Sequence, residues 1–148
     1  MGGVEPPFGG GVFIADTSAW ARSGRAAVAD AWQEAFSAGQ IATCPAVKLE
    51  LLHAARDGAE FDARQEFLAA LRDIPITRSV TNAALFALRK LAHVQPRYQR
   101  GVPLPDLLIA AAAQDAGLGV LHYDRHYDRL TEVLAFESRW IAPPGSLD

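Results

Sequence analysis

Four acidic residues, widely separated in the chain, occupy positions from which their side chains can meet. Two of them directly follow short apolar runs, at residues 12–15 and 120–123, that have the character of buried strands. Asp106 stands in the first turn of a predicted helix, and Glu50 stands within the second turn of another. In an open parallel sheet, groups that follow strands and begin helices collect along one edge. We therefore expect a shared site built from Asp16, Glu50, Asp106 and Asp124.

Four carboxylates in one cleft predict a metal site. Their mutual repulsion raises pKa values in a medium of reduced dielectric unless a cation is present. Oxygen donors that need no cysteine or histidine suit Mg²⁺ or Mn²⁺. A divalent ion held in this way can assist the hydrolysis of a phosphodiester bond. We expect Asp16, Asp106 and Asp124 to bind the metal and Glu50 to complete the catalytic set.

Each acid also has a simpler explanation when it is taken alone. Asp16 and Asp106 can be helix N-terminal acids, which the helix dipole and the free backbone N–H groups stabilise. Glu50, with lysine and leucine neighbours, can be a solvated residue on a helix face. The metal hypothesis therefore depends on the joint placement of all four residues.

Basic and hydroxyl residues near the acids are candidates for substrate contacts. Arg22 follows the first acid, whereas Arg97 and Arg100 precede the third, and arginine can clamp a phosphate with two hydrogen bonds. A solvated surface is the alternative for all three. The hydroxyl groups of Thr17 and Ser18 can contact substrate or water beside the first acid, or can cap the helix that starts there.

Composition and charge narrow the class of protein. A chain of 148 residues, half of them hydrophobic, has the size of one ordinary domain with its own core. A net charge of −3 without long runs of one sign argues against a disordered tail or a DNA-coating protein. No apolar run is long enough to span a bilayer, and the single Cys44 cannot form an internal disulfide. We expect a cytoplasmic protein.

The remaining pattern predicts one α/β domain. The Gly- and Pro-rich residues 1–11 carry no secretory signal, so we expect a flexible leader there and a domain over 12–148. Short apolar strands alternate with amphipathic helices, which indicates a parallel sheet covered on both faces. Predicted strands lie at 12–15, 41–43, 120–123 and 140–142, and predicted helices start after residue 16 and lie at 25–38, 45–56, 61–71, from a cap at Ser79 or Thr81 to residue 95, and at 106–116.

The segments around the four acids are similar to one known family. They are Ile14–Ser18, Val47–Leu52, Pro105–Ala113 and Leu121–Leu130. In their order and spacing, the chain resembles the VapC-type PIN-domain toxins from about Val12 to its end. The resemblance implies a three-layer α/β/α fold with a short central parallel sheet, an endoribonuclease acting on RNA and an acidic quartet made of the four residues above. It also implies inhibition by a small VapB antitoxin, and a homodimer.

One segment departs from the family pattern. Many relatives read Asp-Arg-Asp-Phe where this chain reads Asp-Arg-His-Tyr, so a fifth acid is replaced by His126. This histidine can hold water, face a phosphate, or simply form hydrogen bonds at the surface. Asp128 can turn toward the site or toward solvent. Both residues stay outside the predicted set.

Two other functions remain open at this point. A phosphoaspartyl phosphatase or receiver domain would also carry an aspartate after its first strand, but Ser18 stands where the second acid of an Asp-x-Asp pair would be, and no late lysine follows a strand. A PIN fold that binds RNA or a partner without cutting is the second alternative. The presence of all four acids favours the nuclease.

Overall fold

Five short parallel strands form the centre of the molecule, which the computed structural model describes over residues 6–147. The strand order is β3-β2-β1-β4-β5, and every neighbouring pair is parallel. The central strand carries Phe13 opposite Ile41 on one side and opposite Gly119 on the other. The strands are β1 (Phe13–Ala15), β2 (Ile41–Thr43), β3 (Arg72–Asp73), β4 (Gly119–His122) and β5 (Ser138–Trp140).

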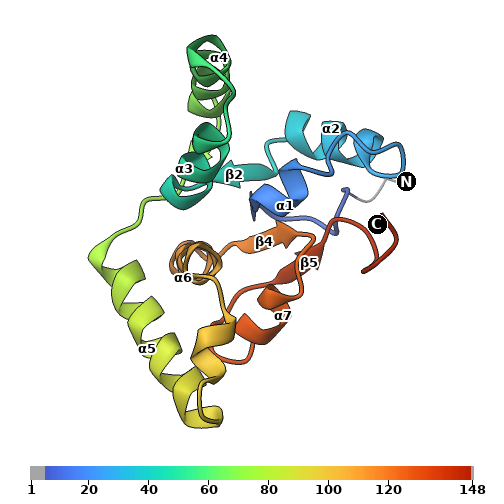
Figure 1. Cartoon of the computed structure of the whole chain (residues 1–148). Helices are drawn as coiled ribbons and strands as arrows, with labels where there is room; N and C mark the ends of the chain where they lie inside the picture. The colour runs from blue at the N-terminus through green and yellow to red at the C-terminus, as the bar shows by residue number, and fades with distance from the viewer. Residues whose placement is uncertain (1–5, 148) are drawn as a thin grey trace.

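Helices cover both faces of this sheet, so the predicted three-layer α/β/α fold is confirmed (Figure 1). Side chains alternate along β1: Phe13 and Ala15 pack with α1 and α2, whereas Ile14 packs with α3, α5, α6 and α7. The helices are α1 (Thr17–Trp20), α2 (Ala29–Ser37), α3 (Pro45–His53), α4 (Gly58–Ala69), α5 (Arg78–Val94), the 3-10 turn η1 (Tyr98–Gly101), α6 (Leu104–Ala116) and α7 (His126–Leu130).

The most buried helix is α6, which lies against the sheet. Residues 109–113 of this helix have no exposed surface, and four of the five are alanines, whose small side chains let the helix approach the sheet closely. The helix ends at Gly117, whose φ of 69° favours glycine. Close packing of α6 fixes the position of Asp106 in its first turn.

Among the described residues, no helix has both the length and the hydrophobicity needed to cross a membrane.

Several predicted boundaries differ from the structure by a few residues. Helix α4 begins at Gly58 rather than at residue 61, because the side chain of Asp57 accepts a hydrogen bond from the backbone of Glu60 and caps the helix there. Helix α5 is capped by Thr77, whose hydroxyl accepts from the backbone of Val80, and not by residue 79 or 81. Turns occupy residues 21–28, so α2 starts later than expected.

Two short elements were not predicted at all. Strand β3 consists of two exposed polar residues at the sheet edge, which show no strand-like alternation. Helix α7 has only five residues, too few for a helical period to be visible. The last strand, β5, lies two residues earlier than the predicted 140–142. Of these, α7 matters most, because it contributes side chains to the site described below.

The predicted leader is only partly within the described residues. Residues 1–5 lie outside them. Residues 6–11 form turns, in which Phe8 packs against the core on the α2 face and the side chain of Gln40 donates to the carbonyl of Gly11. The segment next to the first strand is therefore attached to the domain.

Candidate active site

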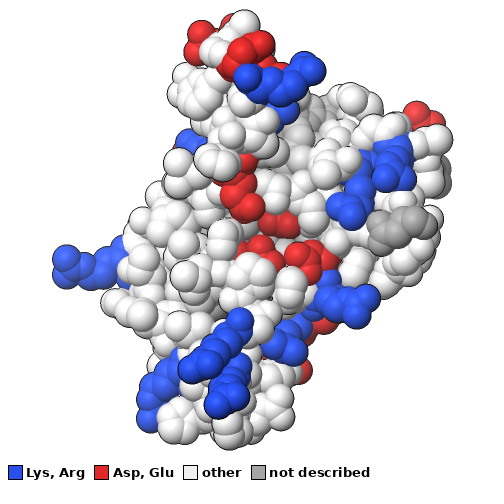
Figure 2. Space-filling model, in the orientation of Figure 1, with Lys and Arg blue, Asp and Glu red and all other residues white. Residues whose placement is uncertain are grey.

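The four predicted acids come together at the carboxyl edge of the sheet. Asp16, Asp124 and Glu50 each act electrostatically on Asp106, and Asp16 also acts on Glu50. Figure 2 shows acidic side chains gathered in a hollow of the surface, in the region where α1, α3, α6 and α7 meet in Figure 1. We call Asp16, Glu50, Asp106 and Asp124 the acidic cluster.

The first acid is almost completely buried and is held by three hydrogen bonds. Asp16 caps α1, with Oδ2 accepting from the backbone N–H (3.1 Å) and the hydroxyl (2.5 Å) of Ser18. The same Ser18 hydroxyl accepts from the backbone N–H of Tyr123 at the end of β4 (3.0 Å). Ser18 therefore connects Asp16 to the end of the neighbouring strand. Asp16 itself caps α1 by accepting from the backbone N–H of Ser18.

The third hydrogen bond comes from Tyr127 in α7, whose hydroxyl donates to Oδ1 of Asp16 over 2.8 Å. Tyr127 has no exposed surface. Burial and the negative charges of Asp16, Asp106 and Asp124 raise the pKa of this phenol well above its usual value, so it remains a neutral donor. Sequence reasoning missed this residue, since its place depends on the unpredicted α7; a tyrosine three residues after Asp124 was the only signal.

Two members of the acidic cluster have buried oxygens without a hydrogen-bond partner. They are Oδ2 of Asp106 and Oε1 of Glu50. Burial, followed by the charges of Asp16, Asp124 and Glu50, raises the pKa of Asp106 to about 8. Burial and Asp16 also raise the pKa of Glu50, against a hydrogen bond from Thr17 that lowers it. Unpaired carboxylate oxygens in a negative pocket fit a divalent cation with hard oxygen ligands.

The fourth acid is positioned by a buried histidine. The backbone N–H of Asp124 donates to Nδ1 of His122 (3.1 Å), whose Nε2 lies 2.7 Å from the hydroxyl of Ser138 in β5. Burial lowers the pKa of His122 to about 4, so the ring is neutral, with the hydrogen on Nε2. Sequence reasoning did not single out His122, because a histidine inside an apolar strand looks like part of the core.

His126, at the start of α7, brings a ring nitrogen next to two acids of the site. Its Nδ1 is 2.7 Å from Oδ1 of Asp124 and 3.7 Å from Oδ2 of Asp106. One possible ligand atom from each of these three residues lies within 4.8 Å of the other two. Asp128, by contrast, is turned to β5, where it accepts from Ser138 (3.4 Å) and from the indole of Trp140 (3.3 Å).

The predicted substrate-binding residues lie in two different settings. The guanidinium of Arg22 stacks over the ring of Tyr123, 4.4 Å from its centroid, and donates to the carbonyl of Ser18 (3.2 Å). Arg97 and Arg100 are exposed, next to and within η1, where Arg97 has a left-handed backbone with φ of 67°. Figure 2 shows basic side chains below and to the right of the acidic hollow. A role for these arginines, and for Thr17 and Ser18, in substrate binding stays a prediction.

An apolar cavity of about 790 Å³ opens beside the acidic cluster, between α1 and the α3–α4 pair. We call it the α4 groove. Its wall includes Trp20, Leu51 and Phe67, and two acids, Glu50 and Glu60, lie along it. Phe67 is half exposed, although it stacks with Phe36 at 5.2 Å between ring centroids. A groove with this lining suits an apolar segment better than a phosphate backbone.

Residues 13–133 match the family model of the PIN domain, and the chain therefore belongs to the PIN-domain family. It is similar to two relatives from Mycobacterium tuberculosis (strain ATCC 25618 / H37Rv): Ribonuclease VapC18, with 41% identity covering 92% of this chain and 99% of that protein, and Ribonuclease VapC51, with 38% identity covering 92% and 97%. The resemblance found in the four segments is confirmed.

The fold is also similar to that of a solved structure, the DNA-bound VapBC from Salmonella typhimurium. The TM-score is 0.70, with 16% sequence identity over 90% of this chain and 100% of that one. At this level of identity the comparison supports the fold alone, and it agrees with the parallel five-stranded sheet described above.

Proposed function

We propose that this protein is a metal-dependent endoribonuclease, the toxin component of a VapBC-type toxin–antitoxin pair. The observation that carries the proposal is the acidic cluster, with a buried and unpaired oxygen of Asp106, in a chain that is similar to VapC ribonucleases over nearly its whole length. An endoribonuclease of this kind hydrolyses phosphodiester bonds of RNA, in the cytoplasm where RNA lies.

In this proposal Asp16, Asp106 and Asp124 hold Mg²⁺ or Mn²⁺. The bound cation would supply Lewis-acid stabilisation of charge on the phosphate and would acidify the attacking water. The chain's own residues do the rest. Glu50, with one free oxygen, accepts the proton of the attacking water, while the bond from phosphorus to the leaving oxygen breaks and that oxygen takes a proton from solvent.

Hydrogen bonds from neighbouring side chains keep the carboxylates in place during the reaction. Tyr127 and Ser18 hold both oxygens of Asp16, and His122 fixes the backbone of Asp124. Partners of this kind orient metal ligands and reduce the reorganisation that metal binding requires. Arg22, together with Arg97 and Arg100, would hold RNA phosphates at the rim of the hollow.

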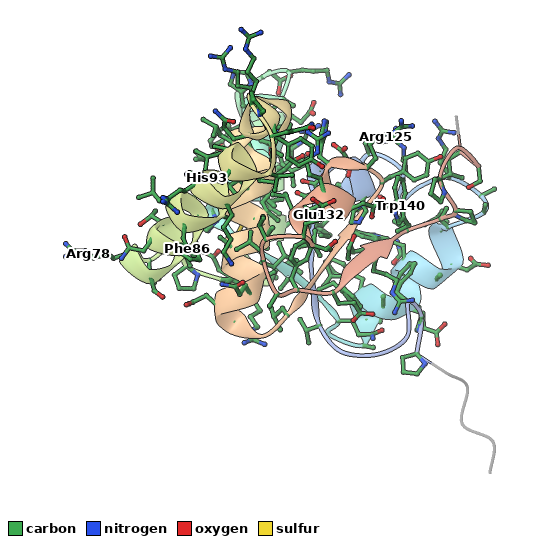
Figure 3. All side chains as sticks on the ribbon, turned by 90° about the horizontal axis from the view of Figure 1, so that it is seen from below. Arg78, Phe86, His93, Arg125, Glu132 and Trp140 are labelled. Atoms are coloured by element: carbon green, nitrogen blue, oxygen red, sulfur yellow. The ribbon has the colours of Figure 1, made fainter. Side chains whose placement is uncertain are left out.

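A protein partner forms the second part of the proposal. The similar structure from Salmonella typhimurium is a VapBC complex, and a VapB-type antitoxin would place an apolar segment in the α4 groove of this chain. A basic residue on that segment would complement Glu50, because Glu60 is already paired with Arg56 and Arg64. We also infer a homodimer, for which α5 and the start of α6 offer exposed Leu85, Phe86 and Leu104; Figure 3 shows Phe86 projecting from α5.

The test is cleavage of a structured RNA by the purified protein. We expect the wild type to cut in Mn²⁺ or Mg²⁺ and to stop when the metal is chelated, and we expect Asp16→Asn to abolish cutting while circular dichroism shows an intact fold. A wild type that binds the RNA without cutting it would instead support a non-cleaving binding module. Labelling of Asp16 by acetyl phosphate would support a phosphoaspartyl enzyme.

A further inference from the structure

A nitrogen donor stands among the oxygens of the acidic cluster. It belongs to His126, whose side chain is 39% exposed, so the ring lies at the mouth of the hollow. Its Nδ1 is nevertheless buried and forms no hydrogen bond, although Oδ1 of Asp124 is only 2.7 Å away.

A second unpaired atom faces the same space. Oδ2 of Asp106, a residue only 7% exposed, also lacks a hydrogen bond and lies 3.7 Å from Nδ1 of His126. Neighbouring ligands in an octahedral site with bonds of about 2.1 Å are about 3 Å apart. The two distances from Nδ1, 2.7 and 3.7 Å, bracket that separation. The three side chains are therefore spaced as ligands of one ion.

The other histidine at the site is already engaged. Nδ1 of His122 accepts the backbone N–H of Asp124, and its Nε2 contacts the hydroxyl of Ser138. Both ring nitrogens are used, and the residue has no exposed surface. Of these two histidines, only His126 therefore has a ring nitrogen left for a metal in the acidic cluster.

We propose that His126, through Nδ1, is a ligand of the metal together with Asp106 and Asp124, and that this nitrogen makes the site prefer Mn²⁺ to Mg²⁺. The inference rests on the proposed function, because it names the ion that the nuclease site takes. Mg²⁺ prefers oxygen ligands and gives up its waters reluctantly, whereas affinity for an imidazole nitrogen rises from Mn²⁺ along the first transition series.

The experiment combines metal competition with pulsed EPR of bound Mn²⁺, neither of which depends on activity. A nitrogen that coordinates Mn²⁺ gives hyperfine coupling in the spin echo. The variants are His126→Asp, which replaces the nitrogen donor with an oxygen donor, His126→Ala, and His93→Asp as a matched control. His93 is an exposed histidine on α5. It lies away from position 126, whose chain neighbour Arg125 is on the α7 side of the molecule (Figure 3).

We expect nitrogen coupling in the wild type and in His93→Asp, and none in His126→Asp, which should still bind Mn²⁺. The preference for Mn²⁺ over Mg²⁺ should fall about tenfold in His126→Asp, and Mn²⁺ affinity should fall about tenfold in His126→Ala. Circular dichroism verifies that each variant is folded.

Two results would overturn the inference while leaving the proposed function intact. One is Mn²⁺ that binds the wild type without nitrogen coupling. The other is coupling or metal preference that is the same in the wild type and in His126→Asp. Failure of Mn²⁺ and Mg²⁺ to bind the wild type at all would overturn the inference and the proposed metal-dependent nuclease together.

Discussion

The hydroxyl of Tyr127 donates to the carboxylate of Asp16 across 2.8 Å, joining residues that are 111 positions apart in the chain. Asp16 lies in the loop after the central strand, whereas Tyr127 belongs to a helix after the neighbouring strand β4. This hydrogen bond fixes one oxygen of the first acid toward α7, while Ser18 holds the other oxygen from α1. The orientation of the first acid is thus set by two helices.

Changing Tyr127→Phe should weaken metal binding without unfolding the protein. The change removes only the hydroxyl, and loss of a hydrogen bond to a charged acceptor lowers the free energy of unfolding by on the order of 2 kcal/mol. Mn²⁺ affinity, measured by calorimetry, should fall about tenfold. Tyr123→Phe is the control, because the Tyr123 hydroxyl accepts from the backbone N–H of Leu147, outside the acidic cluster. Equal metal affinities in the wild type and Tyr127→Phe would show that the bond is dispensable.

The raised pKa of Asp106 predicts how stability without metal changes with pH. A carboxyl whose pKa is about 8 when folded, against 3.8 when unfolded, contributes stability that is full below pH 3.8 and is lost as the pH rises to about 8. His122, with its lowered pKa of about 4, acts in the opposite sense between pH 4 and 6.5. The effect of Asp106 is therefore clearest between pH 6.5 and 8.

In that range the metal-free wild type should lose about 2 kcal/mol of unfolding free energy relative to Asp106→Asn, which cannot ionise. Urea denaturation in the presence of a chelator, at several pH values, measures this difference. Parallel curves for the two proteins from pH 6.5 to 8 would mean that Asp106 titrates near its ordinary value. Saturating Mn²⁺ should remove the difference in the wild type, since the ion stabilises the charged form.

Much of the acidic cluster could be predicted from the sequence. Asp16 and Asp124 each follow an apolar run, and these runs are strands β1 and β4, which pair in the sheet. Because both strands are parallel, their carboxyl ends meet. Asp106 is in the first turn of α6, whose alanine-rich pattern is strongly helical. The local sequence pattern is therefore enough to predict that these three acids lie at the carboxyl edge of the sheet, without knowledge of any tertiary contact.

The side chains that orient the acids could not be predicted in the same way. Tyr127 lies on a helix of five residues, too short to give a periodic signal, and His122 is a polar residue inside a buried strand. The position of His126 relative to Asp106 depends on the packing of α7 against α6, which no local pattern encodes. Tertiary packing decides these contacts, and it also allows β3 to form from two exposed polar residues.

Arg97 and Arg100 should affect RNA binding through charge. Replacing both with alanine should weaken binding of an RNA at moderate salt about tenfold. The slope of log affinity against log salt concentration should fall by about one to two, because fewer counterions are released on binding. Fluorescence anisotropy at several salt concentrations measures both quantities. Arg78→Ala is the control, since this arginine points away from the body at the other end of α5 (Figure 3). An equal loss in the control would indicate a diffuse charge effect and no specific rim.

The α4 groove and the α5 surface should behave differently toward partners. Phe67→Asp places a charge in the groove and should prevent the product of a neighbouring antitoxin gene from co-purifying with the protein. Phe86→Asp alters a comparably exposed phenylalanine on α5, and should leave antitoxin binding intact while shifting the protein from dimer to monomer in analytical ultracentrifugation. The opposite pattern would exchange the two assignments, and no effect of either change would contradict both.

The most direct test of the central claim is calorimetric titration of Mn²⁺ into the wild type, Asp106→Asn and Asp124→Asn at pH 8, with RNA cleavage measured on the same samples. We predict that the wild type binds Mn²⁺ and cuts, and that each variant stays folded but loses both metal binding and cutting. A folded variant that binds Mn²⁺ as tightly as the wild type and still cuts RNA would contradict the claim that these carboxylates form the metal site.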